Sequence, residues 1–115
     1  MINKVTLVGR IYRSELRSTK NGNSVLNARI GVKDKDHGGM TMVDLVFWAA
    51  VAEKAADLLD PEDRTQVIIE GALKQDKWVN EEGEPRTKLS VKVNQFFVLE
   101  DIYSVDSRES EELYE

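Results

Sequence analysis

The sequence predicts an all-β barrel of five strands, with one short helix between the third and the fourth strand. Three observations lead to this prediction. Five stretches alternate apolar and polar residues with a period of two, which is typical of strands that bury one face. One alanine-rich stretch has helical spacing instead. The length of 115 residues suits one domain with one core.

Turn-forming residues separate the first three expected strands. Apolar side chains at every second position mark the first strand, and Asn21-Gly22 marks a turn before the second. The polar stretch 34–39 ends in two glycines, so we expect a flexible loop before the third strand. These three strands are expected over residues 4–12, 26–33 and 42–48.

The helix and the last two strands complete the pattern. The period changes near Ala49, and apolar residues then recur at near-helical spacing until a stop near Pro61. The remaining strands are expected over residues 67–78 and 88–93, joined by a hairpin tip at 80–83. This order of elements is that of the OB-fold, a five-stranded Greek-key barrel with an oligonucleotide groove. A mixed α+β sheet is the structural alternative.

The acidic residues are concentrated in two places, so the net charge of −5 does not exclude a nucleic-acid partner. Residues 106–115 hold five acids and one base, and residues 44–63 hold six acids and one base. The rest of the chain carries a net charge of +4, and the local field depends on where those bases gather. We expect an OB-fold domain over residues 1–105. We also expect a disordered acidic tail over 106–115, which competes with nucleic acid at low salt.

The composition argues against several classes of function. The chain has no cysteine, which excludes disulfides and thiolate metal sites. Lys4 and Arg10 interrupt the N-terminal apolar stretch too early for a signal peptide, and no apolar run reaches the length of a membrane span. His37 stands alone in a glycine-rich loop, and no catalytic motif is present. We therefore expect a cytoplasmic protein without enzymatic activity, metal, cofactor or membrane contact.

Basic and aromatic side chains at outward-facing strand positions indicate a nucleic-acid surface. If Leu26 and Ile30 face the core, then Arg29 on the same strand faces away from it. Basic groups along a backbone, interleaved with rings that stack on bases, are what sequence-tolerant binding of single strands needs. The alternative is a solvated strand face, and for Trp48 a core or subunit contact. The candidate DNA-binding residues are Trp48, Trp78, Arg10, Arg29, Lys33, Lys74, Lys77 and Arg86.

Four segments carry a family resemblance: MINKVTLVGRI, ELRSTKNGNSV, VFWAAVAEKAADLL and VIIEGALKQDKWVNEEGEPR. Over roughly residues 1–99 the chain resembles the bacterial and phage single-stranded DNA-binding protein family. The resemblance implies an OB-fold, homo-oligomers (tetramers or dimers), no catalysis, and the coating of single-stranded DNA in replication, recombination and repair. It places Trp78 at a stacking tryptophan of the family and Trp48 at a stacking phenylalanine.

The sequence departs from the family pattern at groove positions. Met42 replaces a tryptophan, and Asp44 and Asp76 stand where the family often has bases. Each acid is in phase with a tryptophan, so we expect both to repel phosphates and predict that arginine at either position tightens binding. The alternative is that each acid pairs with a neighbouring base such as Arg29 or Lys74.

Three functions remain open at this point. The first is a single-stranded DNA-binding protein, either nucleoid-associated or, if phage-encoded, in the host cytoplasm. The second is an accessory module that recruits replication or recombination proteins through the acidic tail, although the tail lacks the tip typical of the family. The third is an OB-fold nuclease, for which no convergent carboxylate–arginine group is visible. The missing linker and the compact form favour a phage-encoded or accessory member.

Overall fold

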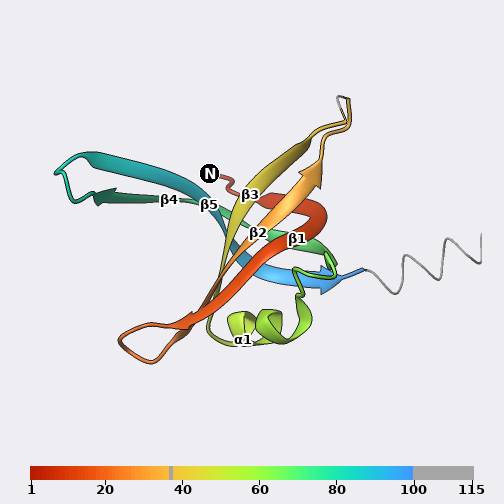
Figure 1. Ribbon diagram of the computed structural model, residues 1–115, viewed down its shortest axis with the longest axis horizontal. Helices are drawn as coiled ribbons and strands as arrows, with labels where there is room; N and C mark the ends of the chain where they lie inside the picture. Colours follow the sequence, from red (N-terminus) through yellow and green to blue (C-terminus); the bar gives the residue numbers. More distant parts are fainter. Residues whose placement is uncertain (37, 100–115) are drawn as a thin grey trace, which may run out of the picture.

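The strands close into one barrel in the computed structural model, which describes residues 1–36 and 38–99. The elements are β1 (Val5–Ser18), β2 (Ser24–Lys33), β3 (Met40–Trp48), α1 (Ala49–Leu58), β4 (Gln66–Val79) and β5 (Pro85–Val98). Around the barrel the strands follow the order β1-β2-β3-β5-β4 (Figure 1). The structure confirms the OB-fold prediction, and the mixed α+β alternative is wrong.

Two strands change neighbours and so close the barrel. β1 pairs with β4 along its first half and with β2 along its second half, and a β-bulge between Ile11 and Arg13 interrupts the second ladder. β3 is antiparallel to β2 but parallel to β5, and the two strands share only the register pairs Leu45–Val91 and Val46–Lys92. This seam between β3 and β5 is the shortest ladder of the barrel.

The first strand is longer than its alternation predicts. It continues to Ser18, whereas the expected end at residue 12 left Arg13 and Arg17 outside the strand. The bulge explains the difference, because one inserted residue shifts a period-two pattern by one position. The fifth strand also exceeds its expected range of 88–93, because residues 85–87 near the hairpin tip and 95–98 at the other end also pair with β4.

The core fills the barrel and the space under α1. Phe47 and Phe96 meet edge to face with ring centroids 5.7 Å apart. The helix contributes Ala52 and Ala55, whose small side chains let it lie close to the barrel. Full burial of a large apolar side chain stabilises the fold by about 1.5–3 kcal/mol. The buried cluster comprises Ile11, Leu26, Ala28, Ile30, Leu45, Phe47, Ala52, Ala55, Leu59, Val67, Ile69, Val91 and Val93.

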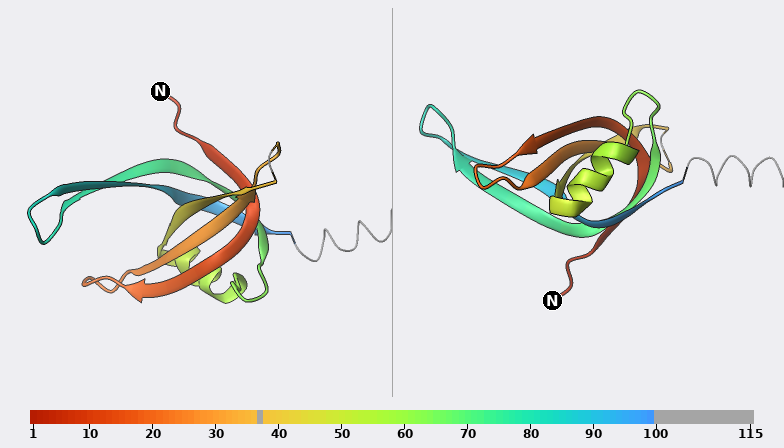
Figure 2. Two further views of the ribbon diagram at one scale, coloured as in Figure 1. Left: turned by 45° about the horizontal axis from the view of Figure 1, so that its top comes forward. Right: turned by 90° about the horizontal axis from the view of Figure 1, so that it is seen from below.

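A glycine lets β4 and β5 approach closely where β4 is irregular. The register shifts between Glu70 and Gly71, and a Cβ atom on Gly71 would lie 2.1 Å from the carbonyl oxygen of Lys92. Any other residue would therefore force the backbone to move. Beyond this point the β4–β5 hairpin continues past the barrel as an arm, residues 74–90. The arm and the β1–β2 hairpin project on the same side of the barrel (Figures 1 and 2).

Candidate nucleic-acid interface

Side chains on the outer face of β1, β2 and β3 form rows that cross the three strands. Residues in register on neighbouring strands lie side by side, so each row is a line of adjacent side chains. The rows are Arg13–Arg29–Asp44, Glu15–Asn27–Val46 and Arg17–Val25–Trp48. One row therefore begins with two bases and ends in an acid, and another ends in a tryptophan.

The arm presents a second polar face. Alternation along β4 turns Lys74, Asp76 and Trp78 to one side. Their register partners on β5 are Ser90, Lys88 and Arg86, in that order. The same side of the arm thus carries three bases, one acid and one tryptophan.

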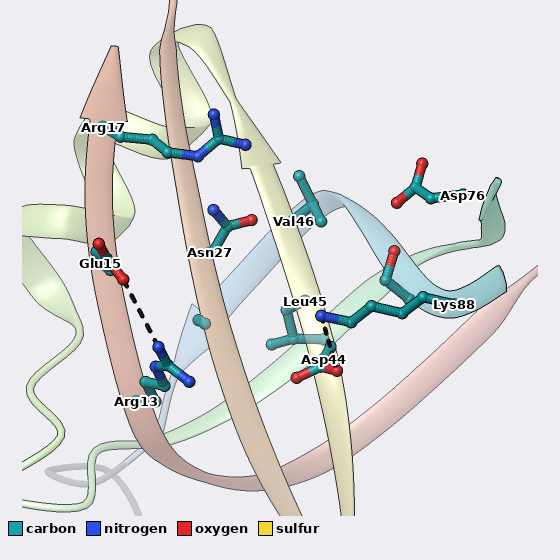
Figure 3. A pocket seen from close by; sticks show the side chains of 11 residues that line it. Arg13, Glu15, Arg17, Asn27, Asp44, Leu45, Val46, Asp76 and Lys88 are labelled. Carbon is teal, nitrogen blue, oxygen red and sulfur yellow. Dashed lines mark ion pairs between the residues drawn. The ribbon is translucent and has the colours of Figure 1, made fainter. Parts of the chain in front are cut away.

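A groove lies between these two faces (Figure 3). Its volume is about 350 Å³. All five strands contribute to its walls, and in the close view Asp76 and Lys88 of the arm lie beside β3. The lining residues are Arg13, Glu15, Arg17, Asn27, Ala28, Asp44, Leu45, Val46, Asp76, Lys88 and Ser90.

Asp44 pairs with one base on each of the two faces. Its Oδ1 accepts a hydrogen bond from Arg29 Nε at 3.0 Å, and its Oδ2 lies 3.3 Å from Lys88 Nζ. The carboxylate thus connects β2, β3 and β5. Partial burial raises the pKa of Asp44, but the hydrogen bonds and charges of Lys88 and Arg29 lower it more, so the pKa lies below its ordinary value.

The other ion pairs of the two faces are more exposed, and each connects residues two positions apart in the chain. Exposed pairs of this kind contribute about 0–1 kcal/mol each. They join Lys74 to Asp76 at 3.6 Å, Arg86 to Glu84 at 3.4 Å and Arg13 to Glu15 at 3.8 Å. Asp44 and Asp76 therefore lie on the expected surface, but both are paired, as the alternative interpretation required.

One tryptophan lies on each of the two faces, and neither is among the residues that line the groove. Trp78 is 46% exposed near the end of the arm. Trp48 is half-buried at the end of β3, and Lys74 Nζ lies 5.7 Å from its ring centroid, within cation–π range. Val25, between Arg17 and Trp48 in its row, is fully buried but outside the core cluster.

Three of the predicted site residues lie away from the groove. Lys77 alternates to the opposite side of the arm from Trp78. Arg10 and Lys33 line a separate pocket of about 450 Å³ beyond the bulge of β1, where Arg10 Nη1 donates to the carbonyl oxygen of Arg64 at 2.9 Å. The other five predicted residues lie on the two faces that flank the groove, but none of them is among the residues that line it: Trp48, Trp78, Arg29, Lys74 and Arg86.

The list of candidate site residues omitted three bases that line the groove, although the sequence places them among the bases at the end of the first strand and beside the last hairpin. Arg13 and Arg17 lie after the bulge, where the alternation of β1 changes phase and no longer indicates a face. Lys88 reaches Asp44 across the seam between β3 and β5, a contact between distant segments. The density of bases after residue 10 was the available signal for the two arginines.

The comparison with known families decides the classification. Residues 2–99 match the family described as the single-strand binding protein family. The chain belongs to this family. The match spans every residue that lines the groove, so the candidate interface is part of the family domain.

A curated member of the family comes from Treponema pallidum (strain Nichols) and is named single-stranded DNA-binding protein. It is 29% identical over 97 residues, which cover 78% of this chain and 53% of that protein. The chain thus spans about half the length of this curated relative.

Two further expectations concern metal ions and membranes. Among residues 1–36 and 38–99, no three or more acidic or histidine side chains are grouped so as to hold a metal ion. Within the same ranges, no helix has the length and apolar character needed to cross a membrane. The lone His37 and the tail expected over 106–115 lie outside the described residues.

Proposed function

We propose that this chain binds single-stranded DNA with little sequence preference and catalyses no reaction, acting in DNA replication, recombination or repair. The observation that carries the proposal is the groove between the β1–β2–β3 face and the arm, with bases in its walls and one tryptophan on each of the two faces that flank it. Membership of the single-strand binding protein family supports it.

Binding would combine stacking with neutralisation of phosphates. Each base stacked on an aromatic ring contributes about 1–3 kcal/mol. Each phosphate neutralised by a base makes affinity fall with salt, by a slope of about −0.7 for single strands. The groove lining holds three bases, Arg13, Arg17 and Lys88, and three acids, Glu15, Asp44 and Asp76. We therefore expect a small salt slope and a large share of stacking in the affinity.

A fluorescence titration tests the proposal, because Trp48 and Trp78 are the only tryptophans. Oligo-dT should quench the intrinsic emission, and the affinity should fall between two salt concentrations. Duplex DNA of the same length is the control, and oligo-U compares RNA with DNA. Absence of binding, or saturation without any quenching, would contradict stacking in this groove.

The charge balance of the groove favours a second candidate, an OB-fold module that recruits replication or recombination proteins. The arm bases Lys74, Lys88 and Arg86 all lie against carboxylates, which lowers their attraction for DNA. The same titration separates the two candidates. Failure of oligo-dT to bind at low salt would favour the accessory module.

We also propose that the chain forms a homo-oligomer, a dimer or a tetramer, through an apolar row on the outside of the barrel. Val8, Ile68 and Phe97 are in register across β1, β4 and β5. Val8 and Phe97 are about half exposed, with Ile68 between them. A contiguous exposed apolar surface is typical of an interaction site.

Phe97→Glu is expected to lower the molar mass of the particle in light scattering, because it places a charge in an apolar contact. Leu89→Glu is the matched control, since Leu89 is also exposed and apolar but lies on the arm. A wild-type protein that is monomeric at every concentration, or an equal effect of both variants, would exclude this row as the interface.

A further inference from the structure

Asp44 differs in its contacts and its burial from the other paired acids in and beside the groove. Glu15, Asp76 and Glu84 each form an ion pair with a base two residues away on the same segment. Asp44 instead contacts two bases from two other strands, and its side chain is only 26% exposed. Its carboxylate is the one point in the described residues where an acid bridges the β1–β2–β3 face and the arm.

The surroundings of this carboxylate form a site for one anion. Arg29 Nε–H and the Lys88 ammonium converge on the two oxygens of Asp44. Arg13 lies beyond Arg29 in the same row, and Asp76 is the register partner of Lys88 on β4. Like a carboxylate, a phosphodiester shares one negative charge between two oxygens that accept hydrogen bonds from guanidinium and ammonium groups.

We propose that the Asp44 carboxylate occupies, in the free protein, a subsite for a backbone phosphate of the DNA. An incoming phosphate then displaces Asp44 from its contacts with Arg29 and Lys88. The inference rests on the proposed binding of single-stranded DNA. Asp44 is then an internal competitor. Asp44 pairs with Arg29 and Lys88 while the groove is empty, and these ion pairs must break before the two bases can contact DNA.

The competition has a consequence for selectivity. A small anion offers only its charge, and Asp44 already supplies that charge from within the chain at high local concentration. A single strand also offers bases that stack on Trp48, four residues from Asp44 on β3, and on Trp78. The register partner of Trp78 is Arg86, two residues from Lys88. The groove therefore admits a phosphate when stacked bases accompany it, and it discriminates against free anions.

Asp44→Asn tests the competition, because it removes the charge while keeping the size of the side chain. Asp76→Asn is the matched control. Asp76 lines the same groove and has the same charge, but it contacts only Lys74, on its own strand. Both variants lose one negative charge, so the difference between them measures the release of Arg29 and Lys88 rather than the general field.

We expect Asp44→Asn to tighten the binding of oligo-dT at low salt by about two- to tenfold, the range that one or two partly exposed ion pairs correspond to. The salt slope should steepen by about 0.7 for each additional phosphate neutralised. Asp76→Asn should tighten binding by less than Asp44→Asn. Equal gains in both variants, or weaker binding of Asp44→Asn, would overturn the proposal, because Asp44 would then order the bases for DNA.

A measurement on the unaltered protein covers the case in which Asp44→Asn fails to fold. The pKa of the Asp44 carboxyl group can be followed by carbon NMR with and without saturating oligo-dT, whose thymines do not titrate in acid. Displacement by a phosphate removes Arg29 and Lys88 from Asp44, so the pKa should rise on binding. An unchanged low pKa in the saturated complex would refute the competition. Loss of all oligo-dT binding by the wild type would instead refute the proposed function.

Discussion

Replacing Trp78 with alanine is expected to weaken the binding of oligo-dT by about 1–3 kcal/mol, or roughly five- to 150-fold, because one stacked base loses its ring. Trp78 lies near the end of the arm, outside the core cluster, so the fold should keep its stability. Fluorescence anisotropy of a labelled oligonucleotide measures the affinity directly. The variant should also lose the part of the quenching that this ring supplies.

Two controls separate stacking from a general disturbance of the arm. Trp78→Phe keeps an aromatic ring and should retain most of the affinity. Val79→Ala changes an exposed neighbour on the opposite side of the arm and should bind like the wild type. If Trp78→Ala binds as tightly as either control, the ring does not stack on DNA.

Replacing Phe47 with alanine is expected to reduce the free energy of unfolding by about 3–5 kcal/mol, the usual loss for truncating a large aromatic side chain in a core. Phe47 is fully buried and packs edge to face on Phe96, so its removal leaves a cavity between β3 and β5. Domains of this size are typically stable by about 5–15 kcal/mol. In urea denaturation, the variant should therefore reach its unfolding midpoint at a low urea concentration.

Leu89→Ala provides the comparison for this second variant. Leu89 is an apolar residue of the arm with most of its side chain in solvent, so its truncation should change stability by well under about 1 kcal/mol. Similar losses in the two variants would mean that the arm is part of the cooperative core. The Phe47 variant should also lose affinity for oligo-dT at temperatures where it unfolds, because Trp48 follows Phe47 in β3.

The fold was predictable from the sequence because burial alternates cleanly along most strands. In β2, for example, Leu26, Ala28 and Ile30 are all buried, as the period of two predicts. The bulge after Ile11 was not predictable, since an inserted residue leaves no mark in the composition of β1. The prediction therefore ended that strand early and assigned Arg13 and Arg17 to no face.

The sequence predicted the site only where the alternation of side chains along a strand determines which way a residue points. The outward direction of Arg29, Lys74 and Trp78 follows from their neighbours within each strand. Which outward residues meet depends on register and on the closure of the barrel. The contact between Asp44 and Lys88 forms across the parallel seam of β3 and β5, and sequence spacing carries no information about such a pair.

The short seam also bears on the order in which the chain folds. The β1–β2–β3 meander and the β4–β5 hairpin are each made of contacts between consecutive strands, and hairpins form within microseconds. The pairs Leu45–Val91 and Val46–Lys92 join segments almost half the chain apart and must wait for a long loop to close. The groove lies between these two locally formed units. A strand bound in it therefore holds together the two halves that the chain is expected to join last, so binding and barrel closure stabilise each other.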